Sequence, residues 1–224
     1  MYNWFGLFLT IFLSMKLQIQ PMQPAILLEF NTPIGGCMAY WPDLEEMQKT
    51  ADLAKAIFIE AFSTTYKQYY LSSGSVEPIE KWLRLREGLT LEKWLDNTFD
   101  DEFQEYLLGL KSFVYLRDSK NNLIGWLSHS LISEKGDLYL SQCSLEADSR
   151  NQKVATAVFV ELFKNGCIKA LFPEAKEVKL IARKINTIAG HLYLKAGFYK
   201  DETIDPSLYG ESYDDRYVGY RSAL

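Results

Sequence analysis

The eighteen residues from Leu145 to Leu162, LEADSRNQKVATAVFVEL, decide the fold of this chain. The stretch begins as the end of a strand, passes through a short turn and enters an amphipathic helix. The turn holds Arg150, and the small residues Ala155 and Ala157 follow where the helix starts. Such a turn can direct free backbone N–H groups and the positive end of a helix dipole at one point. We therefore expect an anion to bind at residues 150–155.

Length, composition and charge favour one globular domain. The chain has 224 residues, which is enough for one well-filled core and tight for two full domains. Its 48% hydrophobic and 24% charged residues are ordinary for a globular protein. The net charge of −5 argues against general nucleic-acid binding, which needs a basic surface.

The few cysteines and histidines restrict the chemistry. Cys37, Cys143 and Cys167 are widely spaced and odd in number, which favours a reducing compartment, so we expect a cytoplasmic protein. With only His129 and His191 besides, the chain cannot assemble a zinc cluster at these spacings, and no metal site is predicted. A serine triad lacks the support of a GxSxG turn.

An apolar run, MYNWFGLFLTIFLSM, occupies residues 1–15. It is shorter than the roughly 20 residues of a membrane span, and it lacks the basic start and small-residue cleavage site of a signal peptide. Three interpretations stay open: a membrane-facing or signal-like segment, a helix packed on the domain, and a chain that truly starts at Met15 or Met22. We group residues 1–36 as this segment and an irregular lead-in with one strand near 26–30.

Hydrophobic periodicity predicts the order of elements in the remaining domain, residues 37–224. A helix should begin after Asp43, a plausible N-cap, and the pattern stays helical to about residue 110. Strands are expected at 113–117, 123–132 and 138–145, and then at 177–182 and 217–222. Further helices are expected at 153–171 and 187–196. This order predicts an α/β domain with a mixed, mainly antiparallel central sheet flanked by helices on both faces.

The helical segment before the strands has two notable features. EKWL occurs at 80–83 and again at 92–95, which indicates two similar amphipathic helices rather than an internal repeat. An acidic cluster follows, most simply a solvated face, with a cation-binding site as the alternative; it comprises Asp100, Asp101, Glu102 and Glu105.

Two segments resemble the motifs of the GNAT superfamily of N-acetyltransferases. In the first, Leu145 precedes Arg150 by five residues and Ala155 follows, but Lys153 stands where the family has its first glycine. A frame two residues later, with Gln152, Ala155 and Ala157, satisfies a relaxed version of the pattern and is less favoured. The resemblance covers residues 37–224, with a helical insertion at about 65–110 in place of a shorter connection.

The second segment resembles the later motif of the same superfamily. It runs from Asn186 through Ala189 and Tyr193 to Gly197 and Phe198. Two motifs in the right order, separated by the right helix and strand, make the resemblance specific. It implies the GNAT fold and an enzyme that transfers the acetyl group of acetyl-CoA directly to a primary amine in a ternary complex.

The resemblance also implies roles for particular residues. Tyr193 becomes the general acid that protonates the departing CoA thiolate, unless it is a tyrosine merely buried against the sheet. Asn186 would orient the cofactor, cap a helix, or both. The residues implied to bind acetyl-CoA through the strand end and the turn are Cys143, Ser144, Leu145, Arg150, Asn151, Gln152, Lys153, Val154 and Ala155. A positive φ at Lys153 should weaken this binding, whereas a helical φ makes lysine harmless there.

The general base is left open. Strand alternation places Asp137, Tyr139, Ser141 and Cys143 on one face, and Tyr139 stands where many relatives have a glutamate. Asp137 or Glu60 could act through a water chain, or no dedicated base is needed. His129 is a further candidate, although an isolated strand histidine is more often structural. Cys143 is interpreted as a buried thiol rather than an acyl carrier.

The acceptor and the alternatives also stay open. A small amine, a polyamine, an aminoglycoside, an amino acid, a peptide N-terminus and a lysine side chain all remain candidates, and the insertion's aromatic and acidic residues favour a cationic one. The chain could instead be a non-catalytic acyl-CoA-binding or interaction module, or a membrane-associated acyltransferase. Both a monomer and a homodimer are compatible with the sequence.

Overall fold

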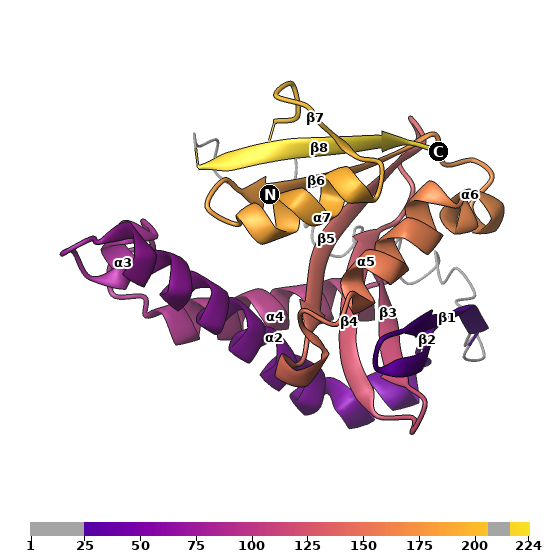
Figure 1. The fold of residues 1–224 in the computed structure, drawn as a ribbon, viewed down its shortest axis with the longest axis horizontal. Helices are drawn as coiled ribbons and strands as arrows, with labels where there is room; N and C mark the ends of the chain where they lie inside the picture. The colour runs from indigo at the N-terminus through magenta and orange to yellow at the C-terminus, as the bar shows by residue number, and fades with distance from the viewer. Residues whose placement is uncertain (1–24, 206–215) are drawn as a thin grey trace, which may run out of the picture.

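A computed structural model describes residues 25–205 and 216–224, with side chains described from Leu28 onward. In these residues eight strands form one sheet in the order β1-β2-β3-β4-β5-β6-β8-β7 (Figure 1). The strands are β1 Ala25–Thr32, β2 Gly35–Trp41, β3 Lys111–Asp118, β4 Leu123–Ser130, β5 Asp137–Leu145, β6 Glu177–Arg183, β7 Tyr199–Lys200 and β8 Tyr217–Ala223. Every described pair of neighbours is antiparallel except β5 and β6. The predicted mixed, mainly antiparallel sheet is confirmed.

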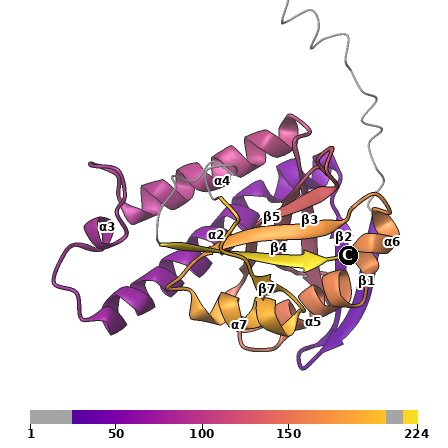
Figure 2. The same ribbon diagram turned by 90° about the horizontal axis from the view of Figure 1, so that it is seen from above.

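Helices cover both faces of this sheet (Figure 2). They are α2 Leu44–Ser73, α3 Ile79–Trp82, α4 Leu91–Leu107, the short 3₁₀ turn η1 Ala147–Ser149, α5 Val154–Phe159, the π-helix η2 Val160–Lys164, α6 Cys167–Leu171 and α7 Thr187–Lys195. α2 and α4 lie on one face, and α5 and α7 lie on the other. Each face therefore buries its own apolar core.

The two cores divide the apolar side chains by face. Phe58, Phe99 and Trp126 centre the core beneath α2 and α4, where their rings contact one another. On the opposite face, Val158 and Phe159 of α5 pack against strand residues of β3 to β6. The sheet thus carries side chains buried on both sides, which holds its central strands rigidly in place.

Helix α2 begins and ends where its capping residues dictate. The side chain of Asp43 accepts a hydrogen bond from the Glu46 N–H at 2.8 Å, which confirms the predicted N-cap. At the other end Gly74 has a φ of 66°, and its N–H donates to the Leu71 carbonyl. Because α2 continues to Ser73, the predicted insertion from residue 65 starts inside this helix.

The structure corrects two predicted helices. The first EKWL copy forms the single turn α3, whereas the second opens the 17-residue helix α4. Arg84 and Gly88 follow α3 with φ values of 53° and 77°, and these left-handed residues stop the helix. The helix expected at 153–171 runs from α5 directly into the π-helix η2 and is then interrupted before α6, where Gly166 has a φ of 81°.

The strand predicted near residues 26–30 is confirmed as β1. It pairs with β2 from Ala25 to Thr32, so the sheet includes residues that precede position 37. The predictions for the apolar run at residues 1–15, and for Met15 or Met22 as the start, lie outside the described residues. No helix in the described ranges is long and apolar enough to cross a membrane.

Candidate active site

Strands β5 and β6 separate in the middle of the sheet and leave an opening. They pair in parallel from Asp137 to Tyr139 on β5 and from Glu177 to Lys179 on β6. Beyond this point β5 continues alongside β4, while β6 continues alongside β8. From Leu140 to Leu145, no described strand covers the β6 side of β5. Its backbone groups there are available to an extended ligand.

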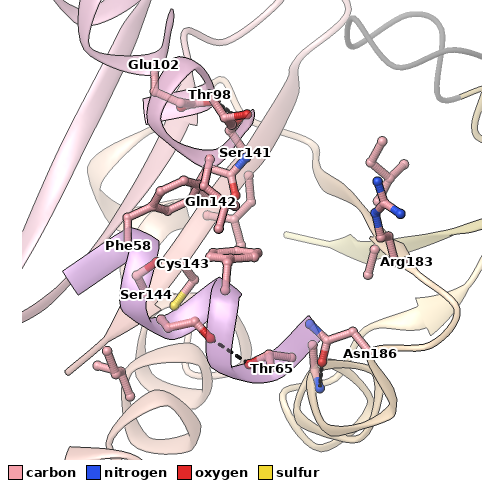
Figure 3. A pocket seen from close by; sticks show the side chains of 18 of the residues that line it. Phe58, Thr65, Thr98, Glu102, Ser141, Gln142, Cys143, Ser144, Arg183 and Asn186 are labelled. Carbon is pink, nitrogen blue, oxygen red and sulfur yellow. Dashed lines mark hydrogen bonds between the residues drawn. The ribbon is translucent and has the colours of Figure 1, made fainter. Parts of the chain in front are cut away.

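A cavity of about 510 Å³ fills this opening, between α2 and α4 on one side and α7 on the other. Figure 3 shows Glu102, Ser141 and Gln142 together on one wall, with Arg183 and Asn186 on the facing wall. The predicted site residues that line it are Cys143, Ser144, Leu145, Arg150, Ala155, Asn186 and Tyr193. The structure therefore brings the two sequence motifs to one cavity, although they are far apart in the chain.

The turn before α5 presents unused backbone donors. In the described part of the chain, none of the N–H groups of residues 151–156 donates to a protein oxygen, whereas Ala157 donates to the Lys153 carbonyl at 2.9 Å. Asn151 and Lys153 have φ values of 61° and 59°. Residues in this left-handed conformation can turn successive N–H groups toward one point, which suits a bound anion. The φ of Lys153 is therefore positive, which is the case in which a lysine at this position is expected to weaken cofactor binding.

Arg150 is held at the edge of this turn by two partners. Its Nε donates to the Leu145 carbonyl at 2.8 Å. Its guanidinium forms an ion pair with Glu60 of α2, with Nη1 at 3.1 Å from Oε1. The Glu60 carboxylate also accepts from the Thr64 hydroxyl at 3.0 Å. Glu60, one of the candidate bases, is therefore bound to Arg150 and is not part of the cavity lining.

A β-bulge in β5 changes which residues face the cavity. The register with β4 shifts so that Ser128 pairs with Gln142 and His129 pairs with Leu140, leaving Ser141 as the extra residue. Cys143 then pairs with Leu127 and packs with the core beneath α5. The expected common face for Ser141 and Cys143 is wrong, because the inserted residue shifts the alternation by one position.

Tyr193 lies on α7 at the wall of the cavity. Its ring contacts those of Phe159, Phe198 and Tyr220, with centroids 5.6, 6.1 and 5.1 Å away. Burial raises the pKa of the Tyr193 hydroxyl well above its ordinary value, and the nearby Cys143 and Tyr220 add to the increase. The hydroxyl therefore keeps its proton at neutral pH and can donate it.

Two neighbours of Tyr193 define its surroundings further. Burial raises the pKa of the Cys143 thiol to about 12, so this group is a neutral thiol at pH 7 rather than a nucleophile. Asn186 caps α7, since its side chain accepts from the Ala189 N–H at 3.1 Å. The predicted capping role of Asn186 is confirmed, and its remaining amide group faces the cavity.

The other candidate bases lie away from the cavity lining. Asp137 lies where β5 and β6 are still paired, with Oδ2 at 2.6 Å from the Lys179 Nζ. Burial alone would raise its pKa, but the Lys179 hydrogen bond and the nearby cations hold that pKa below its ordinary value. His129 is buried beside Phe172, with Nδ1 at 2.8 Å from the Ser130 carbonyl, and burial lowers its pKa.

Glu102 is a cavity residue that the sequence interpretation missed. Glu102 is only 5% exposed. The expectation that the acidic cluster forms a solvated face is therefore wrong for this residue. Its Oε1 accepts from Lys111 Nζ at 2.6 Å and from Ser141 Oγ at 2.5 Å, and its Oε2 accepts from Ser128 Oγ at 2.7 Å. The spacing from Leu95 and Phe99 places Glu102 on the buried stripe of α4, and this signal could have revealed it.

Solved structures of N-acetyltransferases have a similar fold. RimJ from Mycobacterium smegmatis, solved with CoA-disulfide, matches 92% of this chain and 88% of its own at 12% identity and a TM-score of 0.56. PaiA N-acetyltransferase from Thermoplasma acidophilum, solved with coenzyme A, matches 84% of this chain and 99% of its own. The sequence identity is 18% and the TM-score is 0.51.

A third solved structure has a similar degree of likeness. Spermidine N-acetyltransferase from Vibrio cholerae, in complex with CoA and spermine, matches 84% of this chain and 95% of its own at 12% identity and a TM-score of 0.50. No protein-family model matches the chain, and no curated protein matches it. The likeness at these identities is one of fold.

Proposed function

We propose that this protein is an acetyl-CoA-dependent N-acetyltransferase that acts on a primary amine. The observation that carries the proposal is the opening between β5 and β6, which ends at a turn of unpaired N–H groups and has Tyr193 on its wall. The structural neighbours were solved with CoA, and one of them also with the amine spermine. These complexes support a CoA donor and an amine acceptor.

The residues of the opening suit acetyl-CoA. The uncovered edge of β5 at Cys143, Ser144 and Leu145 offers backbone hydrogen bonds to an extended pantetheine arm. The N–H groups of residues 151–155 would hold the pyrophosphate, and Arg150 adds a charge-assisted contact. The free amide group of Asn186, opposite β5, would orient the arm. Arg150 must share or exchange its Glu60 partner when the pyrophosphate binds.

Transfer would proceed in one step from a ternary complex. The amine nitrogen attacks the thioester carbonyl carbon, backbone N–H groups of β5 stabilise the developing oxyanion, and the carbon–sulfur bond breaks. The Tyr193 hydroxyl gives its proton to the departing thiolate, the amine nitrogen loses one proton to water, and the Tyr193 phenolate regains one proton from water. Since Cys143 keeps its proton at neutral pH, direct transfer is favoured over an acyl-cysteine intermediate.

Two carboxylates are candidates to accept the amine proton. Glu60 and Asp137 remain candidate bases, and both would have to act through water because neither lines the cavity. Glu60 lies closer to the cofactor turn through its ion pair with Arg150. An acceptor that arrives as a neutral amine would need neither carboxylate.

A non-catalytic acyl-CoA-binding module is the second candidate. It is motivated by Lys153, whose positive φ strains a turn in which glycine is the usual residue, and by Arg150, which already has an anionic partner. Both features would weaken cofactor binding relative to a glycine-containing turn. Such a module would bind CoA and release no thiol with any amine.

The first test is a calorimetric titration of the purified full-length chain with acetyl-CoA, with desulfo-CoA and free adenine nucleotides as comparisons. We expect saturable binding that Arg150→Glu weakens by more than tenfold, because this change places a second carboxylate beside Glu60 and the pyrophosphate. Glu60→Gln is the matched control, and it should bind as well as the wild type or better.

A thiol-release assay with a broad amine panel then separates the two candidates. Release of CoA with at least one amine supports the transferase, and binding without release supports the module. Absence of binding at millimolar acetyl-CoA would contradict both, since the turn at residues 150–155 would then be no more than a helix start.

A further inference from the structure

We infer that the amine acceptor carries a carboxylate and that Arg183 binds it, an inference that rests on the proposed transferase function. Arg183 is the last residue of β6 and lines the cavity opposite the β5 wall (Figure 3). It was not among the residues singled out from the sequence. Its position, its surroundings and the charge of the neighbouring surface all lead to this inference.

Strand alternation puts Arg183 on the acceptor side of the sheet. Val178, Leu180 and Ala182 of β6 point into the core beneath α5 and α7, so Arg183 points toward α2 and α4. The position of the guanidinium agrees with this direction of the side chain, since its central carbon lies 5.4 Å from the ring centre of Tyr66 on α2. The proposed CoA turn is on the other side, beside α5. Arg183 is therefore placed to contact an acceptor rather than the donor.

The guanidinium of Arg183 is buried without a carboxylate partner. The side chain is 8% exposed and lies against three rings, with centroid distances of 5.1 Å to Trp94, 5.4 Å to Tyr66 and 5.5 Å to Tyr217. Nη1 donates to the Leu83 carbonyl at 3.2 Å. Within the described residues, its Nε is buried without a hydrogen-bond partner, and no Asp or Glu forms an ion pair with it.

A buried cation of this kind is incomplete without an anion. Aromatic faces offset part of the cost of removing a guanidinium from water, but they do not satisfy its N–H groups. A carboxylate matches the planar guanidinium fork with two parallel hydrogen bonds. The donors of Arg183 that no described residue engages therefore provide a recognition element for an anion.

The charge around Arg183 favours an anion at this end of the cavity. A smaller adjoining cavity of about 200 Å³ shares Arg183 as a wall, and three more cations line it: Arg84, Lys184 and Arg216. Its described lining includes no Asp or Glu. The facing end of the main cavity carries Asp101, Glu102 and Glu105, and Lys111 forms ion pairs with the two glutamates.

This division of charge fits an acceptor with two opposite groups. Its amine, protonated in solution, would approach β5 near Ser141 and the Glu102 carboxylate and lose one proton to water before it attacks, while its carboxylate would bind Arg183. A single open guanidinium suits one negative charge better than the two of a phosphate monoester, because the acidic residues across the cavity oppose further negative charge. The acceptor class is thus an amino acid or an ω-amino acid.

The test compares matched acceptors in the thiol-release assay with the full-length chain. α-Amino acids and a length series from β-alanine to 6-aminohexanoate are each paired with the corresponding amide, and phosphoethanolamine is included. We expect kcat/KM for the preferred acid to exceed that for its amide by about tenfold to a hundredfold, the worth of a charge-assisted hydrogen bond. Calorimetry of the same acid with the CoA-bound protein should show the same preference.

Variants at Arg183 assign the preference to this residue. Arg183→Gln should reduce kcat/KM for the acid by about tenfold to a hundredfold and leave its amide within about threefold. Arg183→Lys should fall between, because it keeps the charge and loses the fork. Arg216→Gln is the matched control, since Arg216 donates to the same Leu83 carbonyl at 2.5 Å but lines only the smaller cavity.

The outcomes separate this inference from the proposed function. Equal use of acids and amides by the wild type, or a preference for phosphoethanolamine, would overturn the inference while transfer itself stands. Equal loss with acid and amide in Arg183→Gln would also overturn it. Failure of acetyl-CoA to bind would instead overturn the proposed transferase. The wild-type comparison needs no variant and decides the matter even if Arg183→Gln does not fold.

Discussion

Lys153 shows how one residue sets the shape of the proposed cofactor turn. Its φ of 59° and ψ of 10° lie in the left-handed region, where a Cβ atom crowds the following carbonyl. Glycine adopts this conformation without that penalty. The lysine therefore keeps the geometry of the turn at some cost in stability, and it brings a positive charge beside the expected pyrophosphate.

Lys153→Gly should stabilise the protein by about 0.5–1 kcal/mol, because relief of the left-handed strain exceeds the entropy that glycine adds to the unfolded chain. Thermal unfolding would show this as an increase of about 1–4 °C in Tm. Gln152→Gly is the matched control, since Gln152 has no positive φ, and it should destabilise by about 0.5–1 kcal/mol. Equal losses in both variants would contradict the strain at Lys153.

Tyr193→Phe removes only the hydroxyl group and so tests Tyr193 as the proposed general acid. The ring contacts with Phe159 and Tyr220 do not need the oxygen, so the fold should be kept. We expect kcat to fall by about a hundredfold or more, with acetyl-CoA affinity unchanged within about threefold. Steady-state kinetics and calorimetry measure the two quantities. Unchanged turnover would exclude Tyr193 as the acid.

Strand β5 shows how an element shapes the site through one irregularity. The bulge at Ser141 turns both Ser141 and Gln142 toward α4, and it lets Ser141 donate to Glu102. Helix α4 supplies Glu102, the acceptor of this hydrogen bond, because α4 packs on the same face of the sheet. The polar end of the cavity thus depends on two elements that meet only in the folded protein.

Lys111 holds this arrangement together by compensating two carboxylates. Its Nζ lies 2.6 Å from Glu102 Oε1 and 2.6 Å from Glu105 Oε2. Lys111→Met should destabilise the protein by about 2–4 kcal/mol, because Glu102 would remain buried without its cation. Equilibrium unfolding in denaturant measures the change.

The exposed ion pair of Lys93 with Asp96 supplies the control for Lys111. Its nitrogen and oxygen are 2.7 Å apart, but the lysine is 59% exposed. Lys93→Met should change stability by less than about 0.5 kcal/mol. A small effect at Lys111 as well would show that the Glu102 network is a minor contributor to stability.

The whole molecule buries titratable groups along with its two cores, which makes its stability depend on pH. His129 is 3% exposed, and burial lowers its pKa below the ordinary value near 6.5. Below pH 6.5 the unfolded chain therefore binds a proton that the folded protein does not, so stability falls as pH decreases from there. Above pH 6.5 both states are neutral at this position.

The free energy of unfolding should thus decline between pH 6.5 and 5.5, by up to about 1.4 kcal/mol for each pH unit that His129 stays neutral. His129→Gln should remove most of this decline, whatever its effect on stability at pH 7.5. His191→Gln, at an exposed position on α7, should leave the decline in place. Denaturant unfolding at several pH values measures it, and an unchanged slope in His129→Gln would contradict the prediction.

Local patterns specified much of this fold. Alternation and turn residues located β3, β4, β5, β6 and β8, the Asp43 cap located the start of α2, and Asn186 located the start of α7. These predictions succeed because each depends on residues a few positions apart. The resemblance of the two motifs likewise identified seven residues that line the cavity.

Other features depend on residues that are distant in the chain. Glu60 meets Arg150 across 90 residues, and Arg183 acquires its three rings from α2, α4 and β8. The bulge at Ser141 arises from the register between two strands, and it moved Cys143 to the opposite face. Periodicity encodes the preferred face of an element but not its partner, because burial and pairing are settled only when the strands and helices pack together.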